Sequence, residues 1–450
     1  MTILDFEYSQ TQLQTIANDI IECAKKMGAK DSQLEINENI ATNVDVLNTH
    51  IDHFENSYER SISLTVYLNN KRGSIAVTNI KQQNIEDLVA KALQIATYTE
   101  EDPYQSLPDV KYLCQSIDRE LELYNIPNDN EVTNQKLIEK AYNIEALGLK
   151  NPLITSSDGA SVSLNKHNFV IANSSGLNLG YKTTRFSTSL SLIANTTDGM
   201  QTDYWYSASR DFGTLMLDTK LADITTQRVL RRLDKGVIQN GQYPVIFDND
   251  IAKSIIGNFL GAISGGSLFR RLSFLNDSIN TQIFPDWMNI SEDPFIKKGL
   301  GSCYFDNEGV IVKPREIVKN GTVCGYVLSN YTAKKMNMEL TGNSGGTHNV
   351  VVKNNFTGGV MALAQQMNNG VIIIDTIGHG LNMVTGDYSV GASGILVQNG
   401  KIGQFVDNIT ISGNLKQIFK DIVYITEDDT DNSSMHCGAM LVKSMNVSSA

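Results

Sequence analysis

The sequence predicts an α+β fold, and three observations support this class. Before Leu153, helical and strand patterns alternate irregularly; a run of strand patterns rich in Ser, Thr and Asn follows; and glycine-rich strand patterns dominate from Tyr243 onward. The regular helix and strand alternation of a doubly wound sheet is not seen. We therefore expect an N-terminal region of helices and strands, a middle antiparallel β-rich region, and a C-terminal, glycine-rich domain dominated by strands.

Helical spacing of apolar residues predicts the main helices in order along the chain. The first runs from Gln12 to Met27, and Gly28 follows at the position that favours a helix end. Asn84 is a suitable N-cap for a helix over 85–97, and Gly148 ends a helix over 134–147. Two further helices are expected over 221–233 and 250–263.

Alternating apolar and polar residues predict half-buried strands over 33–37 and 61–68. Asn69 and Asn70 tolerate positive φ, so we expect a tight reversal into 73–78. Residues 102–130 contain several prolines and are interpreted as a connector, whereas 153–209 should form antiparallel strands. Later strands are expected at 350–352, 371–374, 394–397 and 422–426.

The length of 450 residues and these changes in composition and pattern indicate three domains, over 1–105, 106–240 and 241–450. The chain has 37 Lys and Arg against 49 Asp and Glu, a formal net charge of -12. Binding to a phosphate backbone depends on clustered cations, so this balance argues against nucleic acid as the main partner.

The five cysteines are widely spaced, without a CxxC pair, and are typical of reduced thiols in the cytosol. The first ten residues carry no Lys or Arg, so no signal-peptide n-region is expected. No apolar stretch approaches the roughly 20 residues that cross a bilayer. We expect a cytoplasmic protein without a membrane segment.

The six histidines limit the metal chemistry. None is followed by Glu, so the HExxH signature of zinc hydrolases is absent. His50 and His53 could share a helix face, but their surroundings suit a strand as well, and a surface pair without metal is favoured. His379, His436 and Cys437 remain candidate ligands, although adjacent residues on a strand point to opposite faces and a buried core thiol is the simpler role for Cys437.

No GxSxG or SxxK nucleophile motif, Walker loop or GxGxxG fingerprint is present. Three glycine-rich strings, at 264–267, 341–346 and 385–387, could present backbone groups to an anion or peptide, although tight turns are the simpler interpretation. Basic residues gather at 228–235 and at 270–271; the first group follows a helix and is interpreted as its solvated face.

Short phrases in order over nearly the whole chain resemble the PmbA/TldE family. They are Tyr98–Pro103 (YTEEDP), Asn173–Gly176 (NSSG), Gly261–Ser267 (GAISGGS), Phe274–Leu275, Pro285–Trp287 (PDW), Lys298–Leu300 (KGL), Phe305–Gly309 (FDNEG), Ser329–Tyr331 (SNY), Thr341–Gly346 (TGNSGG), Thr385–Ser389 (TGDYS), Ser412–Leu415 (SGNL) and Cys437–Gly438.

The resemblance implies a subunit of a cytoplasmic metalloprotease system that acts on peptides and unfolded segments. In that family a TldD-like chain carries zinc through an HExxxH motif and a distant Cys, and it pairs with a TldE-like chain that lacks the motif. Here Gly257, Asn258 and Ala262 stand at the two His positions and the Glu between them, and only Cys437 matches a ligand. The resemblance therefore implies a metal-free chain without catalytic residues, whose TldD-like partner holds the zinc.

We expect this chain to form a heterodimer with a TldD-like protein and to line one side of the substrate cleft; whether it also forms a homodimer stays open. The residues expected to line the cleft are Gly342, Gly345, Gly346, His348, Thr385, Asp387, Tyr388 and Ser389. Two alternatives are an autonomous metallopeptidase that uses His348, His379 and Cys437, and a regulatory binding protein of the DNA gyrase modulator kind without a proteolytic role.

Overall fold

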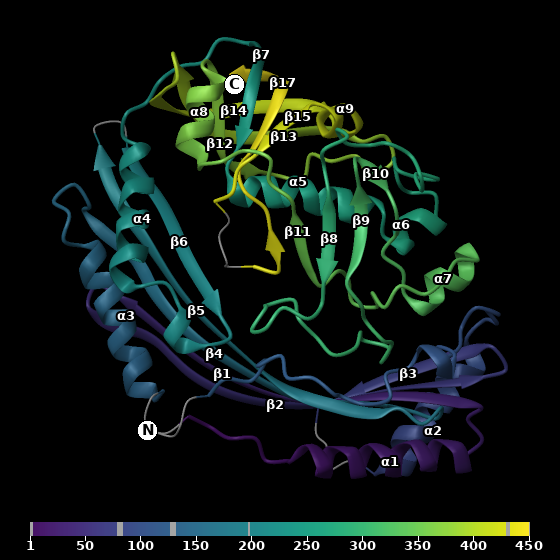
Figure 1. The fold of residues 1–450 in the computed structure, drawn as a ribbon. Helices are drawn as coiled ribbons and strands as arrows, with labels where there is room; N and C mark the ends of the chain where they lie inside the picture. The colour runs from purple at the N-terminus through teal and green to yellow at the C-terminus, as the bar shows by residue number, and fades with distance from the viewer. Residues whose placement is uncertain (1–2, 79–83, 127–131, 197–198, 429–432, 450) are drawn as a thin grey trace.

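A long curved sheet wraps around the C-terminal part of the chain, and helices cover its outer face (Figure 1). The computed structural model describes residues 3–78, 84–126, 132–196, 199–428 and 433–449. Strands and helices are mixed without regular alternation, which confirms the predicted α+β class. Among the described residues, no helix is both long enough and apolar enough to cross a membrane.

The curved sheet has six antiparallel strands in the order β3-β2-β1-β4-β5-β6. The strands are β1 (Asp31–Leu47), β2 (His50–Leu68), β3 (Lys71–Val77), β4 (Ser156–Asn173), β5 (Asn178–Thr196) and β6 (Gly199–Ser209). The pairing of β1 with β4, from Gln33↔Asn173 to Val46↔Ala160, makes one continuous sheet of the first two expected domains. The division into three domains stays a prediction.

The first two strands extend well beyond the short segments that the sequence predicts. In β1 every second residue is buried against the helices, but three of these residues, Ser32, Glu38 and Thr42, are polar, so the apolar alternation is interrupted. Glu38 is satisfied by neighbours, since Asn168 Nδ2 donates to Glu38 Oε2 at 2.7 Å. Asn69 and Asn70 adopt positive φ between β2 and β3, which confirms the predicted hairpin.

Four helices pack on the outer face of the sheet: α1 (Gln10–Lys26), α2 (Ile85–Tyr98), α3 (Asn134–Gly148) and α4 (Asp218–Arg231). Their positions confirm the sequence predictions. Ser9 caps α1 in a capping box with Gln12, and Asn84 caps α2 by accepting from the amide of Glu86. Gly28 follows α1 with φ +99°, a conformation that glycine adopts without strain.

The C-terminal part combines a barrel with a small sheet. In the barrel, β7 (Gly241–Phe247), β12 (Gly370–Ile377), β13 (Asp387–Gln398), β14 (Lys401–Asn414) and β17 (Met440–Ser449) pair in turn, and β14 pairs with β17 to close the ring. The remaining strands are β15 (Ile422–Ile425), beside β17, and the small sheet β10 (Thr322–Val323), β9 (Arg315–Lys319), β8 (Ile290–Asp293), β11 (Asn349–Val352) and β16 (Met435–His436). The helices are α5 (Asn249–Ala262), α6 (Gly265–Phe269), α7 (Asn330–Met336), α8 (Val360–Met367) and α9 (Leu415–Lys420).

The segment 299–309 joins the C-terminal part to the concave face of the curved sheet. Phe169 and Tyr181 from the sheet pack edge-on against Phe305, with ring centroids 6.2 and 5.4 Å apart. Arg210, at the end of β6, donates from Nε to Gly299 O at 3.0 Å and from Nη2 to Leu300 O at 3.0 Å. These contacts fix the position of the segment that carries Cys303 and Asp306.

The first basic cluster is partly an internal ion-pair network, so its interpretation as the solvated face of a helix is wrong for two of its members. Asp203 of β6, with a side chain 2% exposed, accepts from Arg228 Nε at 3.1 Å and from Arg232 Nε at 2.7 Å. Arg232 Nη2 also lies 3.7 Å from Asp375 Oδ2 of the barrel strand β12. A buried carboxylate needs such partners, and here they join the sheet to the barrel.

We expect Asp203→Asn to lower the free energy of unfolding by about 2–4 kcal/mol, because it leaves two half-buried guanidinium groups without their shared carboxylate. Urea unfolding followed by the fluorescence of Trp205 and Trp287 would measure the loss. Asp223→Asn is the matched control, because Asp223 lies on the exposed face of α4, the helix that carries Arg228. It should change stability by less than about 0.5 kcal/mol. Equal stability of the two variants would show that the network contributes nothing.

Candidate functional site

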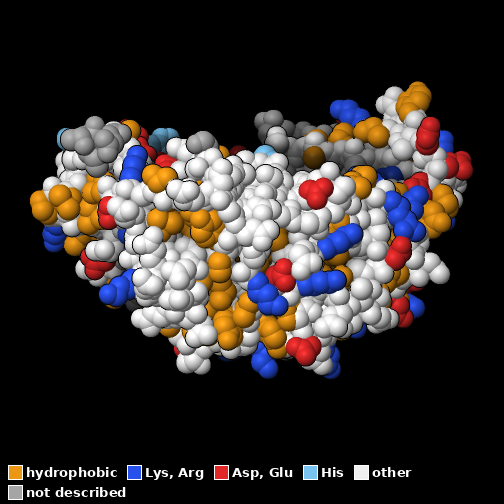
Figure 2. Space-filling model, turned by 90° about the horizontal axis from the view of Figure 1, so that it is seen from above, with side chains coloured by type: hydrophobic (Ala, Val, Ile, Leu, Met, Phe, Trp, Pro, Cys, Tyr) orange, Lys and Arg blue, Asp and Glu red, His pale blue; other side chains and the backbone are white. Residues whose placement is uncertain are grey.

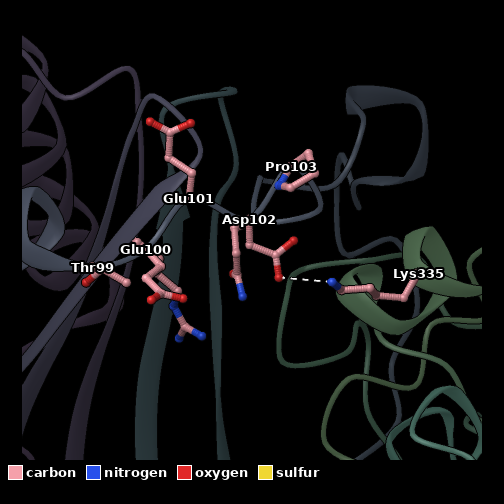
Figure 3. Close-up of a pocket in the computed structure, with 8 residues that line it drawn as sticks. Thr99, Glu100, Glu101, Asp102, Pro103 and Lys335 are labelled. Carbon is pink, nitrogen blue, oxygen red and sulfur yellow. Dashed lines mark ion pairs between the residues drawn. The ribbon is translucent and has the colours of Figure 1, made fainter.

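A groove formed by three neighbouring cavities lies between the curved sheet and the C-terminal part. The first cavity, of about 460 Å³, is lined by Arg72, Gln105, Lys335 and the segment 99–103 (Figure 3). The second, of about 490 Å³, shares Arg72 and Gln105 with the first. The third, of about 120 Å³, shares Asn307 and Ser344 with the second. The shared residues show that the three cavities follow one another along the interface, and together we call them the interdomain groove.

The third cavity contains a hydrogen-bonded cysteine and histidine. Cys303 Sγ lies 3.2 Å from His348 Nδ1, and His348 Nε2 lies 2.9 Å from the carbonyl oxygen of Gly342. A carbonyl only accepts, so Nε2 carries hydrogen, and a protonated Cys303 thiol donates to Nδ1. Burial, with smaller effects from the charges of Asp306 and Glu292, raises the pKa of Cys303 to about 12. The pair therefore holds a neutral thiol and not an activated nucleophile.

Glu292 of β8 organises the turn that precedes β11. Its side chain is almost fully buried and accepts from Arg315 Nε at 2.8 Å, from Asn343 Nδ2 at 2.7 Å and from the amide of His348 at 2.7 Å. These donors satisfy a charge that would otherwise be costly to bury. The carboxylate thereby holds both ends of the glycine-rich turn 342–348.

Asp306 fixes the facing turn in the same way. Its carboxylate accepts from the amides of Glu308, Val310 and Ser344, each at 2.9 Å. Burial raises the pKa of Asp306 to about 7 in spite of these donors. Because the Ser344 amide belongs to the glycine-rich turn, Asp306 ties the two sides of the third cavity together.

An ion pair closes the far end of the groove. Lys335 Nζ lies 3.2 Å from Asp102 Oδ2, and Tyr331 donates to the same oxygen at 2.8 Å. Figure 3 shows the two charged groups facing each other across the cavity, with Glu100 and Glu101 beside them. Burial acts to raise the pKa of Asp102, but the hydrogen bond from the Tyr104 amide, followed by those from Tyr331 and Lys335, holds it below the usual value.

The structure brings together only part of the residue set expected to line the cleft. Gly345, Gly346 and His348 line the third cavity, whereas Gly342 is not one of its lining residues and contacts the His348 ring through its carbonyl. Gly345 and Gly346 have φ of +102° and +116°, and a Cβ on Gly345 would lie 2.5 Å from Asn307 Nδ2, so this turn requires glycine.

The other four expected residues lie apart from the groove, at the start of β13. Thr385, Asp387 and Ser389 are exposed, and Thr385 Oγ1 donates to Asp387 Oδ2 at 2.7 Å. Tyr388 belongs to the core of the C-terminal part, and burial raises its pKa to about 12. None of the four lines any of the three cavities of the groove.

The positions expected to correspond to a zinc motif lie on α5, and their residues do not fit zinc. Gly257 faces open space, Ala262 is fully buried, and neither residue has a ligand atom on its side chain. Asn258 is half-buried, and Cys437 is buried in the same core as Ala262. Across the described ranges, no three or more His, Cys, Asp or Glu side chains gather in a way that could hold a metal ion. His379 is exposed in the loop after β12.

Sequence reasoning missed the residues that build the groove from the sheet side. The strand pattern over 153–209 includes Phe169 and Ile171 but gives no sign that they form the groove wall with Tyr181. The wide spacing of the five cysteines gives no sign that Cys303 lies opposite His348. The phrase Phe305–Gly309 was noted for its family resemblance, and its Asp306 is the residue that ties the turns together.

The neutral state of Cys303 predicts slow alkylation. In native protein at pH 7.5, iodoacetamide should label the exposed Cys324 first and leave Cys303 unmodified, because only the thiolate reacts. Peptide mapping by mass spectrometry would follow each site, and urea-unfolded protein is the control in which all five cysteines should react. Labelling of Cys303 as fast as Cys324 would contradict the hydrogen-bonded neutral pair.

His167, on the concave face beside Phe169, predicts a pH dependence of stability. Burial lowers its pKa to about 4 from the ordinary 6.5, so the unfolded chain binds a proton that the folded chain refuses. The free energy of unfolding is therefore unaffected by this group above about pH 6.5 and decreases as the pH falls towards 4. At pH 5 the decrease is about 1–2 kcal/mol. His167→Gln should flatten this part of the stability curve in urea titrations from pH 7 to 5, and an unchanged slope would contradict the assignment.

Comparisons with known proteins identify the family. Family models for the PmbA/TldA metallopeptidase match in three parts: domain 1 over residues 34–96, the central domain over 127–233 and the C-terminal domain over 240–449. The chain is 36% identical to the metalloprotease PmbA homolog of Haemophilus influenzae, over 98% of this chain and 96% of the relative. It is 35% identical to metalloprotease PmbA of Escherichia coli O157:H7, over 88% of this chain and 87% of the relative.

Solved structures share the fold. A candidate modulator of DNA gyrase from Bacteroides thetaiotaomicron superposes with a TM-score of 0.92 at 24% identity, covering 97% of this chain and 99% of that one. TldE from Thermococcus kodakarensis superposes with a TM-score of 0.83 at 19% identity, covering 96% of this chain and 100% of that one. The resemblance seen in the sequence phrases is confirmed, and the chain belongs to the PmbA/TldD metallopeptidase family.

Proposed function

We propose that this chain is the zinc-free, TldE-like subunit of a cytoplasmic two-chain metalloprotease that cleaves peptides or unfolded segments. The observation that carries the proposal is the composition of α5. A catalytic zinc site needs three protein ligands and a base that activates water, and Gly257, Asn258 and Ala262 supply no imidazole or carboxylate. Zinc and the water-activating base then belong to a TldD-like partner.

The role left for this chain is to hold substrate beside the partner's zinc. An extended peptide can bind along exposed backbone groups, and this mode tolerates many sequences because main-chain hydrogen bonds supply the affinity. Among the described residues, no hydrogen bond uses the amide or the carbonyl of Gly345 or of Thr347. These groups lie on the glycine-rich turn that borders the groove, and they support peptide binding there. Thr385, Asp387 and Ser389 remain proposed lining positions on a separate surface.

Two alternative functions have less support. An autonomous metallopeptidase that uses His348, His379 and Cys437 is not supported, because both ring nitrogens of His348 already have partners and His379 is exposed elsewhere. A gyrase modulator that binds DNA would need a basic surface, whereas Figure 2 shows cations and acids interspersed on the face seen from above, on a chain of net charge -12.

The proposal is tested by producing this chain and a TldD-like chain separately and together. We expect this chain alone to hold less than about 0.1 equivalent of zinc and to cleave no peptide, and the pair to cleave unfolded substrates at least about tenfold faster than either chain. Light scattering of this chain alone and of the mixture would report homodimer and heterodimer. Full peptidase activity in the TldD-like chain alone would contradict the subunit role, and stoichiometric zinc in this chain would favour the autonomous enzyme.

A further inference from the structure

The third cavity of the groove has an apolar wall that is already in place. Phe169, Ile171, Tyr181 and Phe305 line one side, and the centroids of the Phe169 and Tyr181 rings lie 4.6 Å apart in an edge-on arrangement. Phe169 and Phe305 are less than 10% exposed and belong to one buried cluster with Leu113 and Leu177. Because the rings pack against one another and against this cluster, the wall can receive a side chain without rearrangement.

The opposite side of this cavity carries one carboxyl group, Asp306, which three backbone amides satisfy, and is otherwise open to a main chain. The Cys303 thiol is held uncharged by burial, and Gly345 to Thr347 present backbone. A cavity needs roughly 10–15 Å³ to hold one water, so about 120 Å³ has room for one large side chain. A large apolar side chain would gain most from this surface, because burial of its area is favourable and no charge is left without a partner.

The first cavity, at the other end of the groove, has the opposite character. It is lined by Glu100, Glu101 and Asp102 on one side and by Arg72 and Lys335 on the other. Asp102 and Lys335 neutralise each other at 3.2 Å. Within the part of the chain that the structure describes, no ion pair joins Glu100 or Glu101 to a cation, and both side chains are exposed beside the cavity (Figure 3). This rim therefore favours a cation.

We propose that the interdomain groove selects extended peptides that carry a large apolar side chain, which enters the aromatic cavity, and a Lys or Arg side chain, which lies at the Glu100–Glu101 rim. The inference rests on the proposed peptide-binding role and adds the class of peptide. An extended chain suits the site better than a compact ligand, because the three cavities follow one another through shared residues and the open backbone of Gly345 and Thr347 lies at the apolar end.

The selectivity is measured with four synthetic hexapeptides, identical except for Phe or Ala near one end and Arg or Glu near the other. The readout is kcat/KM for cleavage by the full chain paired with its zinc-bearing partner, together with fluorescence anisotropy of the labelled peptides on the pair. We expect the Phe and Arg peptide to be preferred over the Ala and Glu peptide by about 10- to 100-fold.

Thr347→Phe tests the apolar end, because its ring would fill the third cavity. It should abolish the preference for Phe over Ala, because the cavity that would receive the Phe ring is filled. Thr347→Val has the shape of the native side chain without its hydroxyl, and it should retain the preference. Melting temperatures of both variants separate a filled cavity from a damaged fold.

The double variant Glu100→Lys/Glu101→Lys tests the charged end. It should reverse the preference for Arg over Glu by about 3- to 10-fold, and the reversal should fade in high salt because exposed charges are screened. Asp19→Lys/Glu22→Lys, on the exposed face of α1, makes the same change in net charge away from the groove and should keep the native preference.

The outcomes separate the two levels of the proposal. The inference is supported if the wild type prefers the Phe and Arg peptide, if Thr347→Phe removes only the preference for Phe, and if Glu100→Lys/Glu101→Lys removes only the preference for Arg. Cleavage of all four peptides at equal rates would overturn the inference and leave the subunit role in place. No cleavage by the pair of any peptide or unfolded protein would overturn both.

Discussion

The geometry of the groove depends on one contact, the seating of the segment 299–309 on the concave face of the curved sheet. Arg210 is largely buried, and its three nitrogen donors reach the carbonyls of Gly299, Leu300 and Thr184. Burial lowers its pKa, but the three acceptors keep the guanidinium group satisfied, although no carboxylate among the described residues pairs with it. With Phe305 packed against Phe169 and Tyr181, this segment has one position, and the groove is the space that remains beside it.

Two buried carboxylates then convert that position into a defined cavity. Glu292 receives donors from β9, from the glycine-rich turn and from the start of β11, and Asp306 receives three amides, one of them from the same turn. Each carboxylate is costly to bury, and each is compensated only in the folded arrangement. The turn 342–348 is therefore held from both sides, which leaves the backbone of Gly345 and Thr347 facing a fixed opening.

The elements specified by local sequence could be predicted, and those specified by distant contacts could not. The helices α1 and α2 each have helical spacing of apolar residues and a capping residue within one short segment. The Asn69–Asn70 hairpin could be predicted because Asn tolerates positive φ. By contrast, the strand period of β1 is broken at Glu38, whose donor Asn168 is far along the chain. The roles of Cys303 and Arg228 likewise follow from His348 and Asp203, partners that no spacing rule identifies.

The family motifs helped most where the side chains themselves indicate no chemistry. Gly257 and Ala262 on α5 have no functional side-chain groups, and only the resemblance gives a reason to ask why ligand atoms are missing at these positions. The same resemblance grouped Thr385–Ser389 with the glycine-rich turn, although the fold separates them, since one lies at the start of a barrel strand and the other at the sheet interface. Likeness of sequence thus indicated which segments matter, and the packing decided which of them meet.

Hydrogen exchange of the paired protein, with and without a bound uncleaved peptide, tests the central claim most directly. The account places the peptide in the interdomain groove, so protection should appear in segments 99–107, 303–309 and 342–348. Protection confined to 378–389, or an exchange pattern in this chain that the peptide leaves unchanged, would contradict a substrate groove at the sheet interface.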